Sequence, residues 1–260
     1  MAALYPLFAF MAALPFSWAA ALPQLYTMEH GIVGGVPANV GDYPYIVSIQ
    51  QEGVGHFCGG SLLNANTVIT AAHCASASGD GSVAIYIRAG SLNNTYGGVI
   101  SNVASWIVHP EFYRMDYDLS IIKLSTPIPS CGDISYVKLP TSDYDPEAGS
   151  IVSVAGWGTT NSDDGILSNY LRKVDVHVIS RETCEADYAV TKENITAQMM
   201  CAGEKAGGKD SCEGDSGGPI VDADGVIVGV TSWGWGCAKA GYPGVYSRVS
   251  RFLAFIEEHS

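Results

Sequence analysis

The chain has 260 residues, of which 47% are hydrophobic and 15% charged, so it can form a well-buried core in one large domain or two small ones. Its 26 acidic and 13 basic residues give a net charge of −13. This charge argues against binding to nucleic acid, whose phosphates need Lys and Arg, and against adsorption to anionic membranes.

Residues 1–21 contain no charged side chain and consist mostly of Ala, Leu, Phe and Pro. Three alanines at 19–21 offer a cleavage site of the A-x-A type, so we predict a signal peptide. The alternative is a membrane anchor of marginal length. Pro6 and Pro15 favour a cleaved signal, and we therefore expect a secreted, extracellular protein with no membrane association after the signal is removed.

A short polar spacer, residues 22–31, precedes a long region of short apolar or alternating runs. These runs are separated by Gly, Asn, Ser and Asp turns, which is typical of an all-β protein. The clearest expected strands are 45–50, 83–88, 118–124, 151–155 and 225–230. Pro, Ser, Gly and Asp accumulate at 126–145, which predicts a boundary between two halves, about 32–135 and 136–248.

The chain ends with a change from strand spacing to helical spacing. Val249, Phe252, Leu253 and Ile256 would share one face of a helix, which predicts a C-terminal α-helix that packs on the core.

Seven cysteines are many for a cytosolic protein, and none of them forms a C-x-x-C pair, so a zinc site is not expected. In an exported chain they indicate disulfides, although spacing alone leaves the connectivity open.

A serine in a glycine-rich turn, Ser216 in Glu213-Gly214-Asp215-Ser216-Gly217-Gly218, is the strongest candidate for a reactive group. Glycines on both sides permit positive φ and a close approach to another molecule. A serine held in this way can act as a nucleophile, with backbone N–H groups beside it to form an oxyanion hole. The alternative is an ordinary Gly/Ser surface turn.

Two further residues favour the catalytic interpretation. His73 lies in Thr70-Ala71-Ala72-His73-Cys74, and Asp118 opens the alternating run Asp118-Leu119-Ser120-Ile121-Ile122-Lys123-Leu124. A serine needs a base, and the base needs a carboxylate to fix its tautomer. Asp116 is the alternative carboxylate, but we expect it to be a solvated loop acid.

The order His73, Asp118, Ser216 and the motifs IVGG, TAAHC, DLSIIKL and DSCEGDSGGP identify a resemblance that runs from Ile32 to the C-terminus. The chain resembles a trypsin-type serine protease of the chymotrypsin family and is similar to secreted fungal trypsins. The resemblance implies an all-β fold of two packed six-stranded antiparallel β-barrels with a C-terminal α-helix. It also implies one peptidase domain, residues 32–260.

The resemblance further implies a role for each site residue. His73, Asp118 and Ser216 would form the catalytic triad, and the N–H groups of Gly214 and Ser216 the oxyanion hole. Asp210, at the base of the primary pocket, would select Arg or Lys side chains. The implied substrate-binding set is Asp210, Ser211, Ser232, Trp233, Gly234 and Gly244. We expect a monomeric endopeptidase without cofactor, whose partners are peptide and protein substrates and protein protease inhibitors.

Activation by proteolysis is also implied, with residues 22–31 as an activation peptide. Ile32 would become the new N-terminus, and its ammonium would pair with buried Asp215 and order the turn that carries Ser216. Gly31 precedes the cut, so cleavage by a trypsin is not expected. Before the cut, we hypothesise that Asp215 pairs with His56, next to Ser48.

Other residues matched by resemblance have smaller roles. The implied disulfides are Cys58–Cys74, Cys184–Cys201 and Cys212–Cys237, which leaves Cys131 over. For Cys131 we favour a buried free thiol over an intermolecular bridge. Met115 and Tyr188 would line neighbouring subsites, and Glu213 would disfavour acidic residues near the scissile bond.

The sequence contains one loop to compare with a known metal site and two possible glycan sites. The loop 90–98, which matches the calcium loop of animal trypsins, has no carboxylate, so we expect no calcium there and no metal elsewhere. Asn93 and Asn194 begin N-x-T sequons, which predict a glycoprotein without fixing which site is occupied.

Three other functions remain open at this level. A catalytically inactive homologue used for binding would usually lack the serine or the histidine. An ester-directed acyl transferase would have no need of Asp210. A protease with chymotrypsin-like specificity would want an apolar or small residue at position 210.

Overall fold

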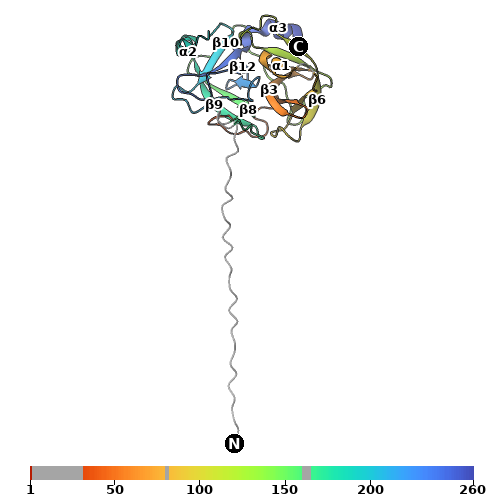
Figure 1. Cartoon of the computed structure of the whole chain (residues 1–260). Helices are drawn as coiled ribbons and strands as arrows, with labels where there is room; N and C mark the ends of the chain where they lie inside the picture. Colours follow the sequence, from red (N-terminus) through yellow and green to blue (C-terminus); the bar gives the residue numbers. More distant parts are fainter. Residues whose placement is uncertain (2–31, 80–81, 160–164) are drawn as a thin grey trace.

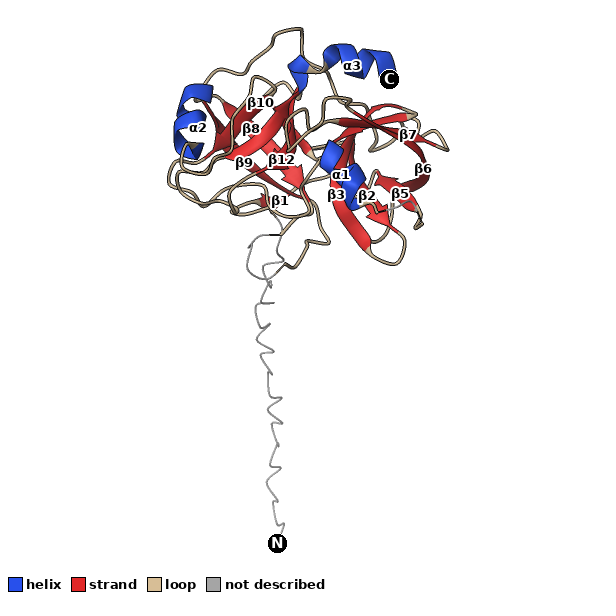
Figure 2. Ribbon diagram, turned by 45° about the horizontal axis from the view of Figure 1, so that its top comes forward, coloured by secondary structure: helices blue, strands red, loops and turns tan. Residues whose placement is uncertain are grey.

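The computed structural model describes Met1 and residues 32–79, 82–159 and 165–260, which form two β-barrels packed side by side (Figures 1 and 2). The predicted signal peptide and activation peptide, residues 1–21 and 22–31, therefore lie outside the described residues, apart from Met1. Among the described residues, no helix is long and apolar enough to cross a membrane.

The first barrel closes in the order β2-β3-β4-β7-β6-β5, with every pairing antiparallel. Its strands are β2 (Ile46–Gln51), β3 (Gly55–Asn64), β4 (Thr67–Thr70), β5 (Ile85–Ala89), β6 (Val99–Val108) and β7 (Ser120–Leu124). Val47, Ile49, Ile69 and Ile121 are fully or almost fully buried, as the alternation of apolar residues along these strands requires.

The second barrel is a sheet in the order β9-β10-β13-β12-β11-β8, closed by pairing of β8 with β9. Its strands are β8 (Ile151–Gly156), β9 (Arg172–Ile179), β10 (Met199–Gly203), β11 (Pro219–Val221), β12 (Ile227–Trp233) and β13 (Gly244–Arg248). The predicted all-β fold of two six-stranded antiparallel barrels is thus confirmed.

The N-terminal segment belongs to the second barrel, although the sequence placed it in the first half. Strand β1 (Val36–Pro37) pairs with β9, and Ile32 is completely buried in the core of the second barrel with Val152 and Val174. Between the barrels, no helix or strand occurs from the end of β7 at Leu124 to the start of β8 at Ile151.

Helices are few and short. The predicted C-terminal helix is present as a 3-10 turn, η1 (Val249–Arg251), followed by α3 (Leu253–His259), and its Phe252 and Phe255 contact His109 after β6. The helix therefore runs from the second barrel back onto the first (Figure 2). Sequence analysis did not anticipate α1 (Ala72–Ala77) or α2 (Arg181–Tyr188).

Candidate active site

The turn that carries Ser216 is held tightly against the first barrel. The N–H of Gly59 on β3 donates to the carbonyl oxygen of Ser216 at 2.8 Å. Gly217 has φ +79°, and a Cβ atom there would lie 2.1 Å from Thr70 Oγ1. Gly214 also has a positive φ, +92°. The two glycines are therefore required for the turn to approach the first barrel and to expose Ser216.

His73 and Asp118 form a close pair at the junction of the barrels. Asp118 Oδ2 lies 2.7 Å from His73 Nδ1, and Asp118 Oδ1 accepts the backbone N–H of His73 at 2.8 Å. The Asp118 side chain is completely buried, whereas that of His73 is 22% exposed. Because a carboxylate can only accept, Nδ1 carries the proton of the neutral ring and Nε2 is left to act as a base.

Ser216 and His73 both lie close to the Cys58–Cys74 disulfide. The sulfur of Cys74 lies 3.9 Å from His73 Nε2 and 3.7 Å from the carbonyl oxygen of Ser216. His73, Cys58 and Cys74 also form a compact His/Cys group of the kind that can bind metals. Both sulfurs are in the disulfide, however, so neither is a thiolate and the group does not fit a metal ion.

Ser232 has a contact that the sequence did not suggest. Its hydroxyl donates to Asp118 Oδ2 at 2.5 Å, so this residue, predicted to bind substrate, also supports the carboxylate that contacts His73. Ser247 Oγ donates to the backbone carbonyl of Asp118 at 2.6 Å. Together with the two contacts from His73, these bonds hold both the backbone and the carboxylate of Asp118 in place.

Asp210 lies in a cavity of about 210 Å³ that opens to Ser216. Ser211, Ser232, Trp233, Gly234 and Gly244 also line this cavity, so the predicted substrate-binding residues are brought together. Asp210 is 3% exposed, and its Oδ2 accepts the N–H of Ala238 at 2.9 Å.

The second carboxylate oxygen of Asp210 is unusual, because Oδ1 is buried with no hydrogen-bond partner in the described structure. Burial raises the pKa of Asp210 to about 7, more than its hydrogen bonds from Ala238 and Ser211 lower it. A Cβ on Gly244 would lie only 2.7 Å from Oδ1, so glycine at this position leaves room beside the buried oxygen. An unpaired buried carboxylate is costly unless a ligand donates to it.

Asp215 is fully buried beside Ser216. Its carboxylate accepts the N–H of Gly158 at 2.7 Å and that of Cys212 at 2.9 Å. Burial nevertheless raises its pKa to about 7. Gly156 leaves the room for this carboxylate, because a Cβ there would lie 2.1 Å from Oδ1. The arrangement can accommodate a cationic partner.

His56 contacts Gly214 rather than Asp215, unlike the hypothesised pair. Its Nε2 donates to the carbonyl oxygen of Gly214 at 2.9 Å, and its Nδ1 lies 2.8 Å from Ser48 Oγ. Burial lowers the pKa of His56 to about 4, so the ring is neutral. Gln50 Nε2 donates to the same Ser48 oxygen, which leaves the Ser48 hydroxyl to donate to Nδ1. The chain of contacts fixes the orientation of Gly214.

Three expectations about individual side chains were wrong. Asp116 is partly buried and accepts a hydrogen bond from Thr196 Oγ1 at 2.7 Å, so it is not a solvated acid. Tyr188 is 1% exposed and donates to the Pro243 carbonyl, so it supports the site from behind and does not line a subsite. Cys131 is an exposed free cysteine, not a buried one. The three implied disulfides are present in the structure.

The loop 90–98 is held by an arginine side chain. Arg88 donates from its two terminal nitrogens to the carbonyl oxygens of Gly97 at 2.5 Å and Thr95 at 3.3 Å. The buried Asn93 carboxamide oxygen accepts the Thr95 N–H at 2.8 Å within the same loop. The guanidinium thus supplies positive charge to the loop carbonyls.

Replacing Arg88 with glutamine is expected to lower the free energy of unfolding by about 1–3 kcal/mol, because charge-assisted hydrogen bonds to the loop are lost. Thermal unfolding of both forms, with and without added calcium, would measure the change. An unaltered melting temperature would show that the arginine does not stabilise the loop.

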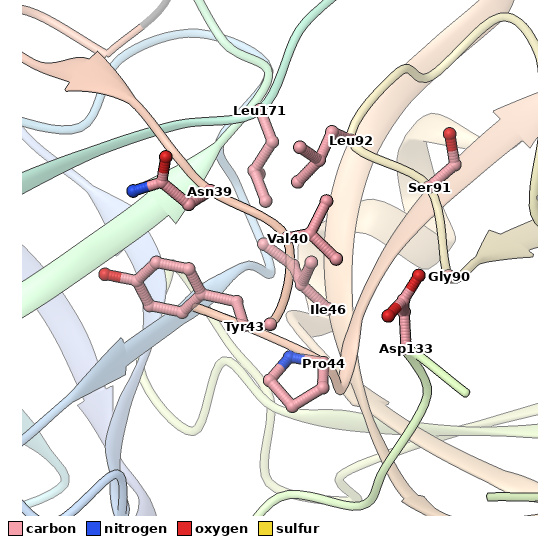
Figure 3. Close-up of a pocket in the computed structure, with 11 residues that line it drawn as sticks. Asn39, Val40, Tyr43, Pro44, Ile46, Gly90, Ser91, Leu92, Asp133 and Leu171 are labelled. Atoms are coloured by element: carbon pink, nitrogen blue, oxygen red, sulfur yellow. The ribbon is translucent and has the colours of Figure 1, made fainter. Parts of the chain in front are cut away.

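A second cavity lies where the segment after β1 meets the first barrel (Figure 3). Val40, Ile46, Leu92 and Leu171 extend toward one another there, and the volume is about 40 Å³. That is room for a few water molecules at most, so this cavity does not fit a substrate side chain.

Comparisons with known proteins agree with this geometry. The sequence model of the trypsin family matches residues 32–256. Trypsin Blo t 3 of Blomia tropicalis is 42% identical over 88% of this chain and 86% of its own length. Trypsin 5G1 of Aedes aegypti is 41% identical over 88% and 85%, and Trypsin alpha of Drosophila melanogaster 40% identical over 90% and 88%, respectively.

Proposed function

This chain belongs to the trypsin family of serine proteases, and from that premise we propose that it is a secreted endopeptidase that cleaves after Arg or Lys. The unpartnered buried oxygen of Asp210, in the cavity that Ser216 also lines, carries the proposal. A guanidinium or ammonium group in this cavity would satisfy that oxygen. An apolar side chain would leave it buried and unpaired.

The proposed mechanism is acyl transfer through a covalent acyl-enzyme. Ser216 Oγ attacks the scissile carbonyl while His73 Nε2 takes the hydroxyl proton and then gives it to the leaving amine. Asp118, which accepts from Nδ1, stabilises the imidazolium formed in between. Water then repeats the steps on the acyl-enzyme, releasing the acid and restoring Ser216. The N–H groups of Gly214 and Ser216 bind the oxyanion.

A panel of chromogenic peptides tests this proposal. The peptides would differ only in the residue before the cleaved bond, which would be Arg, Lys, Phe, Leu or Ala. We expect turnover of the Arg and Lys peptides by the chain that begins at Ile32. Preference for Phe or Leu would overturn the role of Asp210 and keep the triad. No turnover of any peptide would favour a binding protein.

Binding of a small cation to the pocket is expected to depend on pH. Only the ionised carboxylate of Asp210 attracts the cation, and its pKa is raised to about 7 in the free protein. The dissociation constant of benzamidine should therefore be constant above pH 7 and rise about tenfold per pH unit below it.

Calorimetric titration of the Ser216→Ala variant would measure this dependence without turnover. The chain should begin at Ile32, because its free ammonium beside Asp215 would lower the pKa of the Asp215 carboxyl. Asp215 would then not titrate in the same pH range as Asp210. A dissociation constant that stays level from pH 7 to pH 5 would contradict the titration of Asp210.

Activation by cleavage before Ile32 is the second part of the proposal. Ile32 is already buried in the second barrel, and the carbonyl oxygen of its neighbour Val33 accepts the N–H of Asp210 at 3.2 Å. A free Ile32 ammonium would offset the buried charge of Asp215. Acetylating that ammonium is expected to lower kcat/KM by about 10²–10³-fold, the cost of leaving a buried charge unpaired.

Chains that begin at Ile32, with and without the acetyl group, would be compared on the same arginine peptide. Equal activity of the two would show that the ammonium does not assemble the site. The Asp215→Asn variant is a control, because acetylation should alter its activity far less.

Export and modification complete the proposal. The predicted signal peptide would direct secretion, and the mature protein would act as a monomer on proteins and bind protein inhibitors.

Of the two sequons, Asn194 is exposed, whereas Asn93 is 4% exposed and its carboxamide oxygen accepts a hydrogen bond inside the loop. We therefore propose Asn194 as the glycan site; mass spectrometry of peptides from protein made in a eukaryotic host would locate the glycan.

A further inference from the structure

A third cavity lies in the second barrel, where α2 begins beside β10. Its volume is about 310 Å³, larger than that of the Asp210 cavity, and the two cavities share no lining residue. Its walls come from the segment before β8, the end of β9, the start of α2 and β10. The Cys184–Cys201 disulfide ties α2 to β10 next to the cavity, because Cys201 also lines it. A cavity of this volume can hold a small organic molecule.

Most of the cavity lining is apolar. Val178, Ile195, Met199 and Met200 belong to it, and each of these side chains is at most 8% exposed. Methionine side chains are unbranched and polarizable, so the two on β10 can adapt to the shape of a ligand. This part of the cavity therefore suits an alkyl chain or a ring.

The charged residues of the lining are Arg181 and Asp145. Arg181 donates to Asp145 Oδ2 at 3.4 Å, which is near the limit of a hydrogen bond, and to the Met199 carbonyl oxygen at 3.0 Å. Its Nε is buried with no hydrogen-bond partner in the described structure. The Arg181 side chain is 31% exposed, so this weakly paired guanidinium is within reach of a ligand in the cavity.

The charges around the cavity leave an excess of positive charge. Asp145 Oδ2 also accepts from Arg248, so one carboxylate oxygen serves two guanidinium groups. Burial lowers the pKa of Arg248, and the nearby guanidiniums of Arg181 and Arg251 lower it further. An anion would relieve the repulsion among these groups, whereas a cation would add to it.

We propose that this third cavity binds a small amphipathic carboxylate, with its acid group on Arg181 and its apolar part against Ile195 and Met199. A carboxylate can accept two hydrogen bonds from one guanidinium, and the apolar lining would cover an alkyl chain or an aromatic ring. The inference goes beyond the proposed protease function and does not depend on it, because no residue of the triad or of the Asp210 cavity takes part.

Calorimetric titration with octanoate tests the inference. The protein would be the Ser216→Ala chain that begins at Ile32, which should not digest itself. We expect one site with a dissociation constant of about 1 mM or lower, as is typical of a ligand of this size. Octanamide has the same length without the charge and should bind at least about tenfold more weakly. Benzamidine at saturation, placed in the Asp210 cavity, should leave the octanoate constant unchanged.

Variants of the same chain locate the site. Arg181→Gln should weaken octanoate binding at least about tenfold, whereas Arg181→Lys keeps the charge and should restore part of it. Ala148 is an exposed residue of the lining, so Ala148→Phe should also weaken binding by filling space without changing the charge. Arg114→Gln is the matched control, because it removes an exposed guanidinium that lies over the Tyr113 ring and outside this cavity.

Three results would overturn the proposal. One is no saturable heat up to about 10 mM octanoate, roughly ten times the expected dissociation constant. Another is equal binding of octanoate and octanamide, which would mean that the carboxylate is not recognised. The third is octanoate binding that survives both Arg181→Gln and Ala148→Phe, which would place the ligand elsewhere. Unchanged thermal unfolding of each variant would show that a loss of binding is not a loss of folding.

Discussion

Replacing Ser216 with alanine is expected to lower kcat on an arginine peptide by about 10⁵–10⁶-fold, with little change in KM. The reason is that, in the proposed mechanism, Ser216 Oγ forms the covalent bond to the substrate, and alanine has no hydroxyl to form it. The residual rate would come from binding and from the oxyanion hole, which does not depend on the serine side chain. Steady-state kinetics on the chain that begins at Ile32 would measure the loss.

Two controls separate a catalytic role from a structural one. Benzamidine should bind the Ser216→Ala variant as tightly as the native protein, because Asp210 is intact. The Ser125→Ala variant removes an exposed hydroxyl that only donates to the Asn102 carbonyl, and we expect it to retain full activity. A Ser216→Ala variant that kept a tenth of the native kcat would rule out Ser216 as the nucleophile.

Short-range patterns predicted most of the fold and the candidate triad. The strands at 45–50 and 151–155 depend on apolar alternation within a few residues, and the structure has β2 and β8 there. The motifs around His73 and Ser216 are equally local. Each motif could therefore be found without knowing what lies near it in space.

Long-range contacts were the part that the sequence could not provide. The hydroxyl of Ser232 reaches Asp118 across 114 positions of the chain, and no local pattern signals that bond. The segment that follows Ile32 was predicted to belong to the first half, but its strand β1 pairs with β9 of the second barrel. Burial of Tyr188 depends on the rings of Trp233 and Tyr242, which pack on it only after folding.

Changing Asp210 to asparagine is expected to lower kcat/KM for the arginine peptide by about 10²–10³-fold, because a buried charged partner of the substrate is lost. The change keeps the shape of the side chain, and the carboxamide oxygen can still accept the N–H of Ala238. The amide N–H₂ would then occupy the place of Oδ1 and oppose a guanidinium group. Kinetics with Arg and Phe peptides would show a ratio that falls by the same factor.

Stability provides the decisive control for this variant. In the free protein the carboxylate of Asp210 is buried, with one oxygen unpaired, and its pKa is raised from 3.8 to about 7. This raised pKa lowers the free energy of unfolding progressively between those two pH values, and the full loss is present above pH 7. Asparagine has no charge to bury, so Asp210→Asn should be at least as stable as the native protein at pH 8. A variant that is stable yet inactive on arginine peptides assigns the loss to the missing charge. A stable variant that still prefers arginine would mean that another group recognises the cation.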